Sequence, residues 1–247
     1  MNLDFVEGLH LVQQLGVLMK NRPVEHVDVV VAAPFVDLRS VSSIVESERF
    51  AIALGAQHVN AHENGPHTGE ISTSMLKRLN VEWVIVGHSE RRMHYAMSEE
   101  IVRETLAAVV RAGQHAVLCV GEELSIRENA TYHEHVTAQL TSALHGLEER
   151  FHDLVTVAYE PLWAIGTGVN ATSDQVREMT TFLRAELHER SFTSAKVIYG
   201  GSVNSDNAAS LIAESDIDGF LVGGASLKAE SFYAILRACD DCYAVKR

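Results

Sequence analysis

Residues 154–160 read LVTVAYE, an apolar run that ends in a carboxylate. The run shows little alternation of apolar and polar side chains, which is typical of a strand covered on both faces in a parallel sheet. It predicts a buried strand that ends at Glu160. An ionised carboxylate loses its water at such a place, which costs free energy unless a neighbouring group compensates. Glu160 is therefore the first candidate for a functional residue.

Similar apolar runs alternate along the chain with longer segments of helical periodicity. The predicted strands are 27–33, 50–56, 81–87, 115–121, 154–160, 195–201 and 216–224. The predicted helices are 3–20, 37–47, 73–80, 99–112, 133–150, 173–190, 204–214 and 229–238. This alternation predicts an α/β fold with a parallel sheet. Polar residues and glycines follow many different strands, and no G-x-G-x-x-G follows an early one, so a (β/α)8 barrel is favoured over an open doubly wound sheet.

The composition is that of one globular domain with a large core. Of the 247 residues, 47% are hydrophobic, and no Pro/Ser-rich linker, charge block or low-complexity tract divides them. Because α/β barrels of about 250 residues form one unit, we expect a single domain over residues 1–247.

The charge balance argues against several classes of partner. Lys and Arg total 20 against 33 Asp and Glu, giving a net charge of −13, which disfavours nucleic acid and anionic membrane surfaces. A small phosphorylated substrate would need local donors, because the overall field repels it. The N-terminus shows no secretory signal, and no apolar stretch approaches the roughly 20 residues that span a membrane. We therefore expect a cytoplasmic protein.

Cysteine usage indicates neither a disulfide scaffold nor a metal centre. The three cysteines, Cys119, Cys239 and Cys242, are an odd and sparse set, which argues against structural disulfides. The last two form a C-x-x-C pair with no second pair at zinc spacing, so a frayed helix end is favoured over redox or metal chemistry.

Several strand ends carry residues suited to proton transfer and anion binding. The residues at these ends are His88, Glu160, Gly201, Ser202, Gly223 and Gly224. The ends of parallel strands converge on one mouth, so we expect these residues to lie together. Glu160 could act as a general base, and His88 could donate to an oxygen on which negative charge develops. The glycine-rich turns would offer backbone N–H groups to a phosphate.

Each of these residues alone also has a purely structural interpretation. A histidine after a strand is more often a hydrogen-bonding structural residue, a glutamate before proline is usually a solvated turn residue, and Gly-Gly is usually a turn. Their joint occurrence at successive strand ends favours the functional interpretation.

Five segments carry a specific resemblance to a known family. They are VIVGHSERR (84–92), LCVGEELSIREN (118–129), VAYEPLWAIGTG (157–168), VIYGGSVN (197–204) and DGFLVGGASL (218–227). Together they resemble the triosephosphate isomerase family, and the resemblance covers the chain from Met1. It implies a (β/α)8 barrel that interconverts dihydroxyacetone phosphate and D-glyceraldehyde 3-phosphate, a step of glycolysis and gluconeogenesis.

The resemblance implies a role for each matching residue. Glu160 would move the proton between two carbons, and His88 would be a neutral imidazole that polarises the carbonyl, with Glu90 lying just behind them. The positions that match phosphate-binding residues are Gly166, Ser202, Gly223 and Gly224. The family needs no metal or organic cofactor and works as a homodimer, in which Thr68, within NGPHTGEIS (64–72), would approach the neighbouring subunit's site.

The segment after Glu160 resembles the family's lid over the site. Its residues are Pro161, Leu162, Trp163, Ala164, Ile165, Gly166, Thr167 and Gly168. By the same resemblance, Tyr199 and Ser202 are the residues on which the closed lid docks. Closure would exclude water and strengthen the electrostatic interactions within the site.

The chain departs from the family at its first residues. The family's first strand ends in a motif of Asn, any residue, Lys, Met and Asn, of which Met1 and Asn2 match only the last two. We therefore expect a barrel that lacks strand 1 and its lysine, for which neither Lys20 nor Lys228 is an obvious replacement. Losing such a charge typically lowers the rate by a factor on the order of 10²–10³.

Two explanations fit this departure. Either an internal Met was taken as the start, or the chain is short by nature or by design. In the second case it would be a weakly active or inactive relative that only binds small phosphorylated ligands. A barrel enzyme acting on a larger sugar or indole phosphate is a further alternative, against which the short lid argues.

Overall fold

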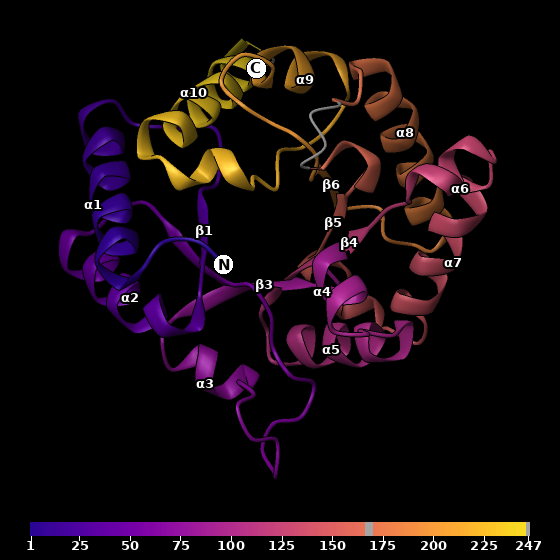
Figure 1. Ribbon diagram of the computed structural model, residues 1–247, viewed down its shortest axis with the longest axis horizontal. Coiled ribbons are helices and arrows are strands. Elements are labelled where there is room, and N and C mark those ends of the chain that lie inside the picture. Colours follow the sequence, from indigo (N-terminus) through magenta and orange to yellow (C-terminus); the bar gives the residue numbers. More distant parts are fainter. Residues whose placement is uncertain (166–169, 246–247) are drawn as a thin grey trace.

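A computed structural model of the chain describes residues 1–165 and 170–245, and its centre is a parallel sheet of six strands in the order β1-β2-β3-β4-β5-β6. The strands are β1 (Val30–Ala33), β2 (Ala53–Ala56), β3 (Val81–Val86), β4 (His115–Val120), β5 (Val155–Tyr159) and β6 (Lys196–Tyr199). They form a curled half-barrel with the helices around its outside (Figure 1). The predicted α/β fold with a parallel sheet is thus confirmed.

The strands nearest the predicted site are the most deeply covered. Every residue of β5 is buried, and so is every residue of β4 after His115. The two strands pair in register from Ala116 with Val155 to Val120 with Tyr159. The apolar run that opened the sequence analysis is therefore a strand covered on both faces, as its lack of alternation predicted.

The prediction of a seventh strand over 216–224 is wrong for most of these residues. The structure shows one parallel bridge there, between Tyr199 and Phe220. Asp216 adopts a left-handed backbone conformation with φ of 54°, and the Asp218 carboxylate accepts the N–H of Val197 at 2.7 Å. Backbone hydrogen bonds still join the segment to β6, from Asp218 N–H to the Val197 carbonyl at 2.8 Å and from Leu221 N–H to the Tyr199 carbonyl at 2.9 Å, so the pairing is present but shorter than predicted.

Helices follow the strands as predicted, with additional short ones at several strand ends. The α-helices are α1 (Phe5–Asn21), α2 (Phe35–Glu48), α3 (Thr73–Lys77), α4 (Ser89–His94), α5 (Glu99–Arg111), α6 (Leu124–Glu128), α7 (Tyr132–Leu144), α8 (Ser173–Glu189), α9 (Ala208–Glu214) and α10 (Ala229–Val245). Three 3₁₀ helices complete the set: η1 (Glu149–Leu154), η2 (Leu162–Ala164) and η3 (Gly224–Leu227). The short α4 and α6 were not predicted, since five or six residues carry too little periodicity to show.

Several helix ends differ from the sequence prediction, and the two largest differences are at C-terminal ends. The helix predicted over 133–150 ends at Leu144, because Gly146 takes φ of 71° and leaves the helical path. The last helix continues to Val245, so the interpretation of Cys239 as part of a frayed end is wrong. Cys239 is buried against the core, and all three cysteines are free thiols. No helix in the described residues is long and apolar enough to cross a membrane.

The sheet separates two apolar layers. The main core lies between the outer face of the sheet and the helices, and includes Leu118 of β4 and Leu106 of α5. A smaller cluster contains Val117, Cys119 and Ala158. Because successive side chains of a strand point to opposite faces, this smaller cluster lies inside the curl. His88 and Glu160 follow the ends of their strands and therefore border this inner layer, which contains no helix.

Helix α1 contains two glycines that make matched test positions. A Cβ at Gly16 would lie 2.4 Å from the ring of Phe50, whereas a Cβ at Gly8 would lie 3.6 Å from the Asp37 carboxylate. We expect Gly16→Ala to lower the free energy of unfolding by about 2 kcal/mol, since overpacking outweighs the gain in helix propensity. Gly8→Ala should raise it by up to about 1 kcal/mol. Urea unfolding of both variants tests this, and equal effects would contradict the packing argument.

Candidate active site

His88 is placed by a tight turn after β3. Gly87 has φ of 71°, and a Cβ there would lie 3.0 Å from the Arg92 guanidinium and 3.1 Å from Val102. The chain therefore needs glycine at this point, both for the left-handed backbone and for space. His88 follows as the N-cap of α4, with its side chain at the open end of the strand.

Glu160 is placed by glycines on the two neighbouring strands. Its N–H donates to the carbonyl of Val120 at 2.8 Å and so continues the pairing of β5 with β4. A Cβ at Gly121 would lie 1.8 Å from the Glu160 carbonyl oxygen, and one at Gly200 would lie 3.1 Å from Glu160 Cγ. The sequence analysis did not assign these glycines this role. Their position directly after strands, beside the predicted base, was the available signal.

The two predicted catalytic side chains contact each other. His88 Nε2 lies 2.9 Å from Glu160 Oε1, and the backbone N–H of Ser89 donates to Glu160 Oε2 at 3.0 Å. The Glu160 side chain is 2% exposed. The Ser89 hydrogen bond to Oε2 and the close His88 ring beside Oε1 compensate in part for the water that the buried carboxylate has lost.

The protonation of His88 is set by opposing influences. Burial acts to lower its pKa, but the hydrogen bond and the charge of Glu160 outweigh burial and raise the pKa above its ordinary 6.5. The exposed Glu90 carboxylate adds a smaller effect in the same direction. On the other side of the ring, the backbone N–H of Glu90 donates to Nδ1 at 3.4 Å, which needs an unprotonated Nδ1. The proton of neutral His88 therefore sits on Nε2, facing Glu160.

The segment after Glu160 is held by a buried carboxylate that the sequence analysis missed. Glu122 Oε1 accepts the Trp163 indole N–H and the Tyr159 hydroxyl, both at 2.9 Å. The Glu122 carbonyl also accepts the N–H of Leu162 at 3.0 Å. Burial raises the pKa of Glu122, although these hydrogen bonds oppose the shift. Its position directly after the strand predicted over 115–121 was a signal of the kind used for His88.

The predicted phosphate-binding residues lie on two of the later turns. The Ser202 hydroxyl donates to the carbonyl of Ala164 at 2.7 Å, so Ser202 contacts the segment for which a lid role is predicted. Gly223 and Gly224 are exposed where η3 begins, and a Cβ at either would meet no atom within 4 Å. The predicted lid and phosphate residues Gly166, Thr167 and Gly168 lie outside the described residues.

Comparison with known proteins decides the family. A sequence model of triosephosphate isomerase matches residues 1–239. The chain belongs to the triosephosphate isomerase family. The resemblance drawn from five short segments is thereby confirmed over almost the whole chain.

Three triosephosphate isomerases are similar to this chain over most of the length of both proteins. The enzyme of Saccharopolyspora erythraea is 43% identical over 236 residues, covering 94% of this chain and 90% of the relative. The enzyme of Streptomyces coelicolor is 43% identical over 244 residues, covering 97% and 95%. The enzyme of Nocardia farcinica is 42% identical over 236 residues, covering 94% and 90%.

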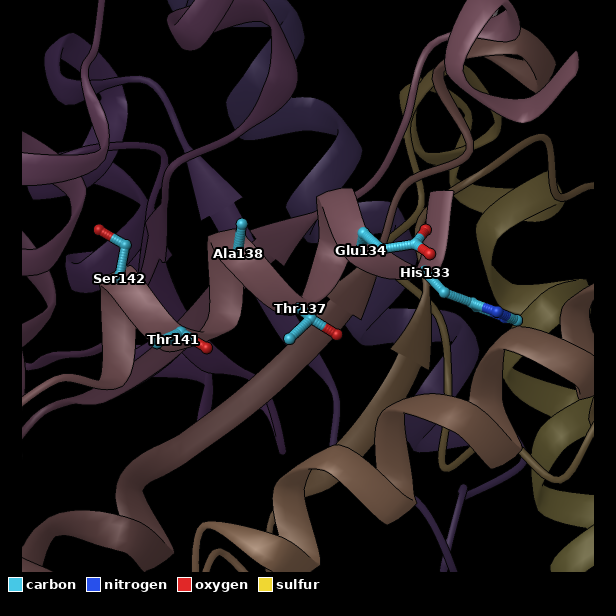
Figure 2. Close-up of a pocket in the computed structure, with 6 residues that line it drawn as sticks. All are labelled: His133, Glu134, Thr137, Ala138, Thr141 and Ser142. Atoms are coloured by element: carbon cyan, nitrogen blue, oxygen red, sulfur yellow. The ribbon is translucent and has the colours of Figure 1, made fainter. Parts of the chain in front are cut away.

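Two surface hollows of this triosephosphate isomerase family member lie away from the predicted site. Figure 2 shows six residues of α7 that line one of them, between His133 and Ser142. Its volume is about 580 Å³. A second cavity of about 900 Å³ lies between α3 and α5. Neither includes His88 or Glu160, so the site is located by side-chain chemistry rather than by volume. Among the described residues, no group of three or more His, Cys, Asp or Glu side chains is arranged to hold a metal.

Thr68 lies apart from these residues. It is exposed in the loop that protrudes from the molecule near α3 (Figure 1). Its predicted contact is with a second subunit, so its role stays a prediction.

The His88–Glu160 contact gives a testable titration. Glu160→Gln removes the charge that raises the pKa of His88, so the pKa should fall, as measured by NMR of the imidazole protons. His115, whose pKa is lowered mainly by burial, should titrate alike in both proteins. An unchanged His88 titration would contradict the assigned cause.

The same contact predicts a pH dependence of stability. Because the folded-state pKa of His88 is raised above the unfolded value, its contribution is fully present below about pH 6.5. The contribution is lost as the pH rises through the folded-state pKa. We therefore compare the unfolding free energies of wild type and Glu160→Gln between pH 5.5 and 8.5. The part of their difference that comes from His88 should become smaller as the pH rises.

Proposed function

We propose that this chain interconverts dihydroxyacetone phosphate and D-glyceraldehyde 3-phosphate. The observation that supports this most directly is the 2.9 Å contact between a buried carboxylate and an imidazole at the ends of β5 and β3, in a chain of the triosephosphate isomerase family. The reaction moves one proton between adjacent carbons and one between the attached oxygens, with no net oxidation. Acid–base groups are therefore sufficient, and we propose no metal and no organic cofactor.

Glu160 is the base in this proposal. Its carboxylate leaves His88 and Ser89, takes the proton from C1 of dihydroxyacetone phosphate and returns it at C2, so that the intermediate is an enediolate. The donors that now satisfy the carboxylate sit at the same strand ends, so only a short movement of the side chain is required. Its burial means that few waters compete for the carboxylate once substrate is bound.

His88 donates from Nε2 to the oxygen on which negative charge develops. When Glu160 turns to the substrate, the influence that raises the pKa of His88 moves away. Burial and the Glu90 N–H at Nδ1 then both favour the neutral imidazole. A neutral donor with its proton on Nε2 can give that proton to the C2 carbonyl oxygen and then take the proton of the C1 hydroxyl, which restores the neutral imidazole and completes the transfer between the two oxygens.

The phosphate is proposed to bind at the backbone amides of Gly166, Gly223 and Gly224 together with Ser202. Local donors are required, since the net charge of −13 repels a dianion at long range. The lid is proposed to comprise Pro161, Leu162, Trp163, Ala164, Ile165, Gly166, Thr167 and Gly168. Its first half is held by Glu122 and by the hydrogen bond from Ser202 to Ala164.

The remaining expectations are proposals about the surroundings of the site. We propose a homodimer in which Thr68 approaches the partner's site, with Glu90 supporting His88, in the cytoplasm. We also propose that residues 1–247 form one domain, which the continuous core supports. The proposed architecture is a (β/α)8 barrel, which the six parallel strands of the described residues support. Among the described residues, β1 pairs only with β2.

Isomerisation of triose phosphates by the purified chain tests the proposal. Glu160→Ala should lower kcat by roughly 10²–10⁴-fold, the usual contribution of a general base. Glu134→Ala, which removes an exposed carboxylate from α7, should leave kcat unchanged. Both variants must be prepared identically, so that contaminating host isomerase would appear equally in each.

The outcomes separate the alternatives. Activity in wild type and Glu134→Ala that is lost in Glu160→Ala supports the proposed function. No turnover by a folded protein that still binds inorganic phosphate would favour the weakly active or inactive relative. Turnover of a larger sugar phosphate but not of triose phosphates would favour the other barrel enzymes.

A further inference from the structure

Glu178, on the outer surface of α8, contacts side chains from two other helices. Its carboxylate accepts Arg127 Nη2 of α6 at 2.9 Å and the Tyr132 hydroxyl of α7 at 2.7 Å. His133 Nε2 lies 3.5 Å away, and its ring stacks on Phe182 of α8. The site described above uses none of these residues. Although partial burial opposes it, the Tyr132 hydrogen bond and the Arg127 charge lower the pKa of Glu178, so the carboxylate is ionised at neutral pH.

Arg127 extends this cluster inward to the lid segment. Its guanidinium lies 4.0 Å from the centre of the Tyr132 ring and 5.9 Å from that of Trp163. Its Nη1 is 3.8 Å from Glu122 Oε1, the atom that accepts the Trp163 indole N–H and the Tyr159 hydroxyl. The Arg127 side chain is only 15% exposed. Arg127 is thus held on its outer side by Glu178 and faces a fully buried carboxylate on its inner side.

Glu122 in turn fixes the chain on both sides of the proposed base. It accepts a hydrogen bond from Tyr159, directly before Glu160, and two from Leu162 and Trp163, just after it. A shift of Glu122 would therefore change the backbone from which the Glu160 carboxylate projects.

We propose that Glu178 is a positioning residue for proton transfer at Glu160. By holding Arg127 against Glu122 and Trp163, it sets the position of residues 161–165 and the direction of the Glu160 carboxylate. Exposed ion pairs contribute little to stability, so the loss of Glu178 should appear in catalysis and in the environment of Trp163 rather than in unfolding. This inference rests on the proposed function, since it assigns Glu160 the role of base.

The chain offers a specific spectroscopic reporter and a matched control. It has two tryptophans, so Trp83→Phe leaves Trp163 as the single emitting indole. Glu186 lies on the same helix and contacts α7 in the same manner, accepting the Thr137 hydroxyl at 2.8 Å and pairing with Arg190 at 3.0 Å. In the described residues, these Glu186 contacts lead to Thr137 and Arg190 and not to Glu122 or Trp163. Glu186→Gln therefore removes a comparable surface carboxylate without touching the proposed path.

The experiment measures kcat, KM and acrylamide quenching of Trp163 for Glu178→Gln and Glu186→Gln in the Trp83→Phe protein. We expect Glu178→Gln to lower kcat threefold to tenfold, which is the size of effect expected when a positioned group is displaced slightly. KM should change less than twofold, and the quenching constant of Trp163 should rise. Glu186→Gln should change none of the three. Equal effects of the two variants, or unchanged quenching in Glu178→Gln, would overturn the proposal.

A double variant tests whether the effect passes through Arg127. If it does, Glu178→Gln should lower kcat no further once Arg127→Gln is present, because the two residues act as one unit. Multiplicative losses would overturn this path. If the wild-type chain turns over no triose phosphate, the proposed function fails, whereas the quenching comparison still shows whether Glu178 positions Trp163.

Discussion

The burial of one carboxylate at the end of a parallel strand is the constraint on which the site depends. Glu160 is shielded from water because it follows β5, which lies between β4 and β6 in the sheet. The Ser89 amide donates to it, and the His88 ring lies 2.9 Å from its other oxygen. Both residues follow β3, so the contact joins the ends of strands that are not adjacent in the sheet. The carboxylate is thereby held buried beside the imidazole.

Glycines make this burial sterically possible. The Glu160 carbonyl occupies the space that a Cβ at Gly121 would take, and its side chain lies against Gly200. Glycine lacks a Cβ, so the backbone of neighbouring strands can approach closely at both points. The same strand ends then carry the polar residues Glu122 and Ser202, which hold the following segment. Space for the base and support for the lid thus arise from one set of turns.

A second buried carboxylate, Glu122, links the site to the outer helices. It binds residues on both sides of Glu160, and Arg127 lies between it and Glu178 on the surface of α8. A buried charge with several donors restricts the conformations open to its neighbours, because each alternative leaves a group unpaired. The arrangement makes the position of the proposed base depend on residues far from the substrate.

The amino-acid sequence by itself determined the α/β class, six of the strands, the family and the convergence of His88 and Glu160 at strand ends; their direct contact was seen only in the structure. Periodicity and local motifs contain this information, because strand burial and turn chemistry are local properties. It overestimated the strand over 216–224, where pairing with β6 is limited to one bridge and its neighbouring backbone hydrogen bonds. Only the tertiary structure decided that Gly121 makes room for Glu160 and that Glu122 holds the segment after Glu160. Such contacts join residues about 40 positions apart, and no local pattern specifies which distant side chains the fold brings within hydrogen-bonding distance.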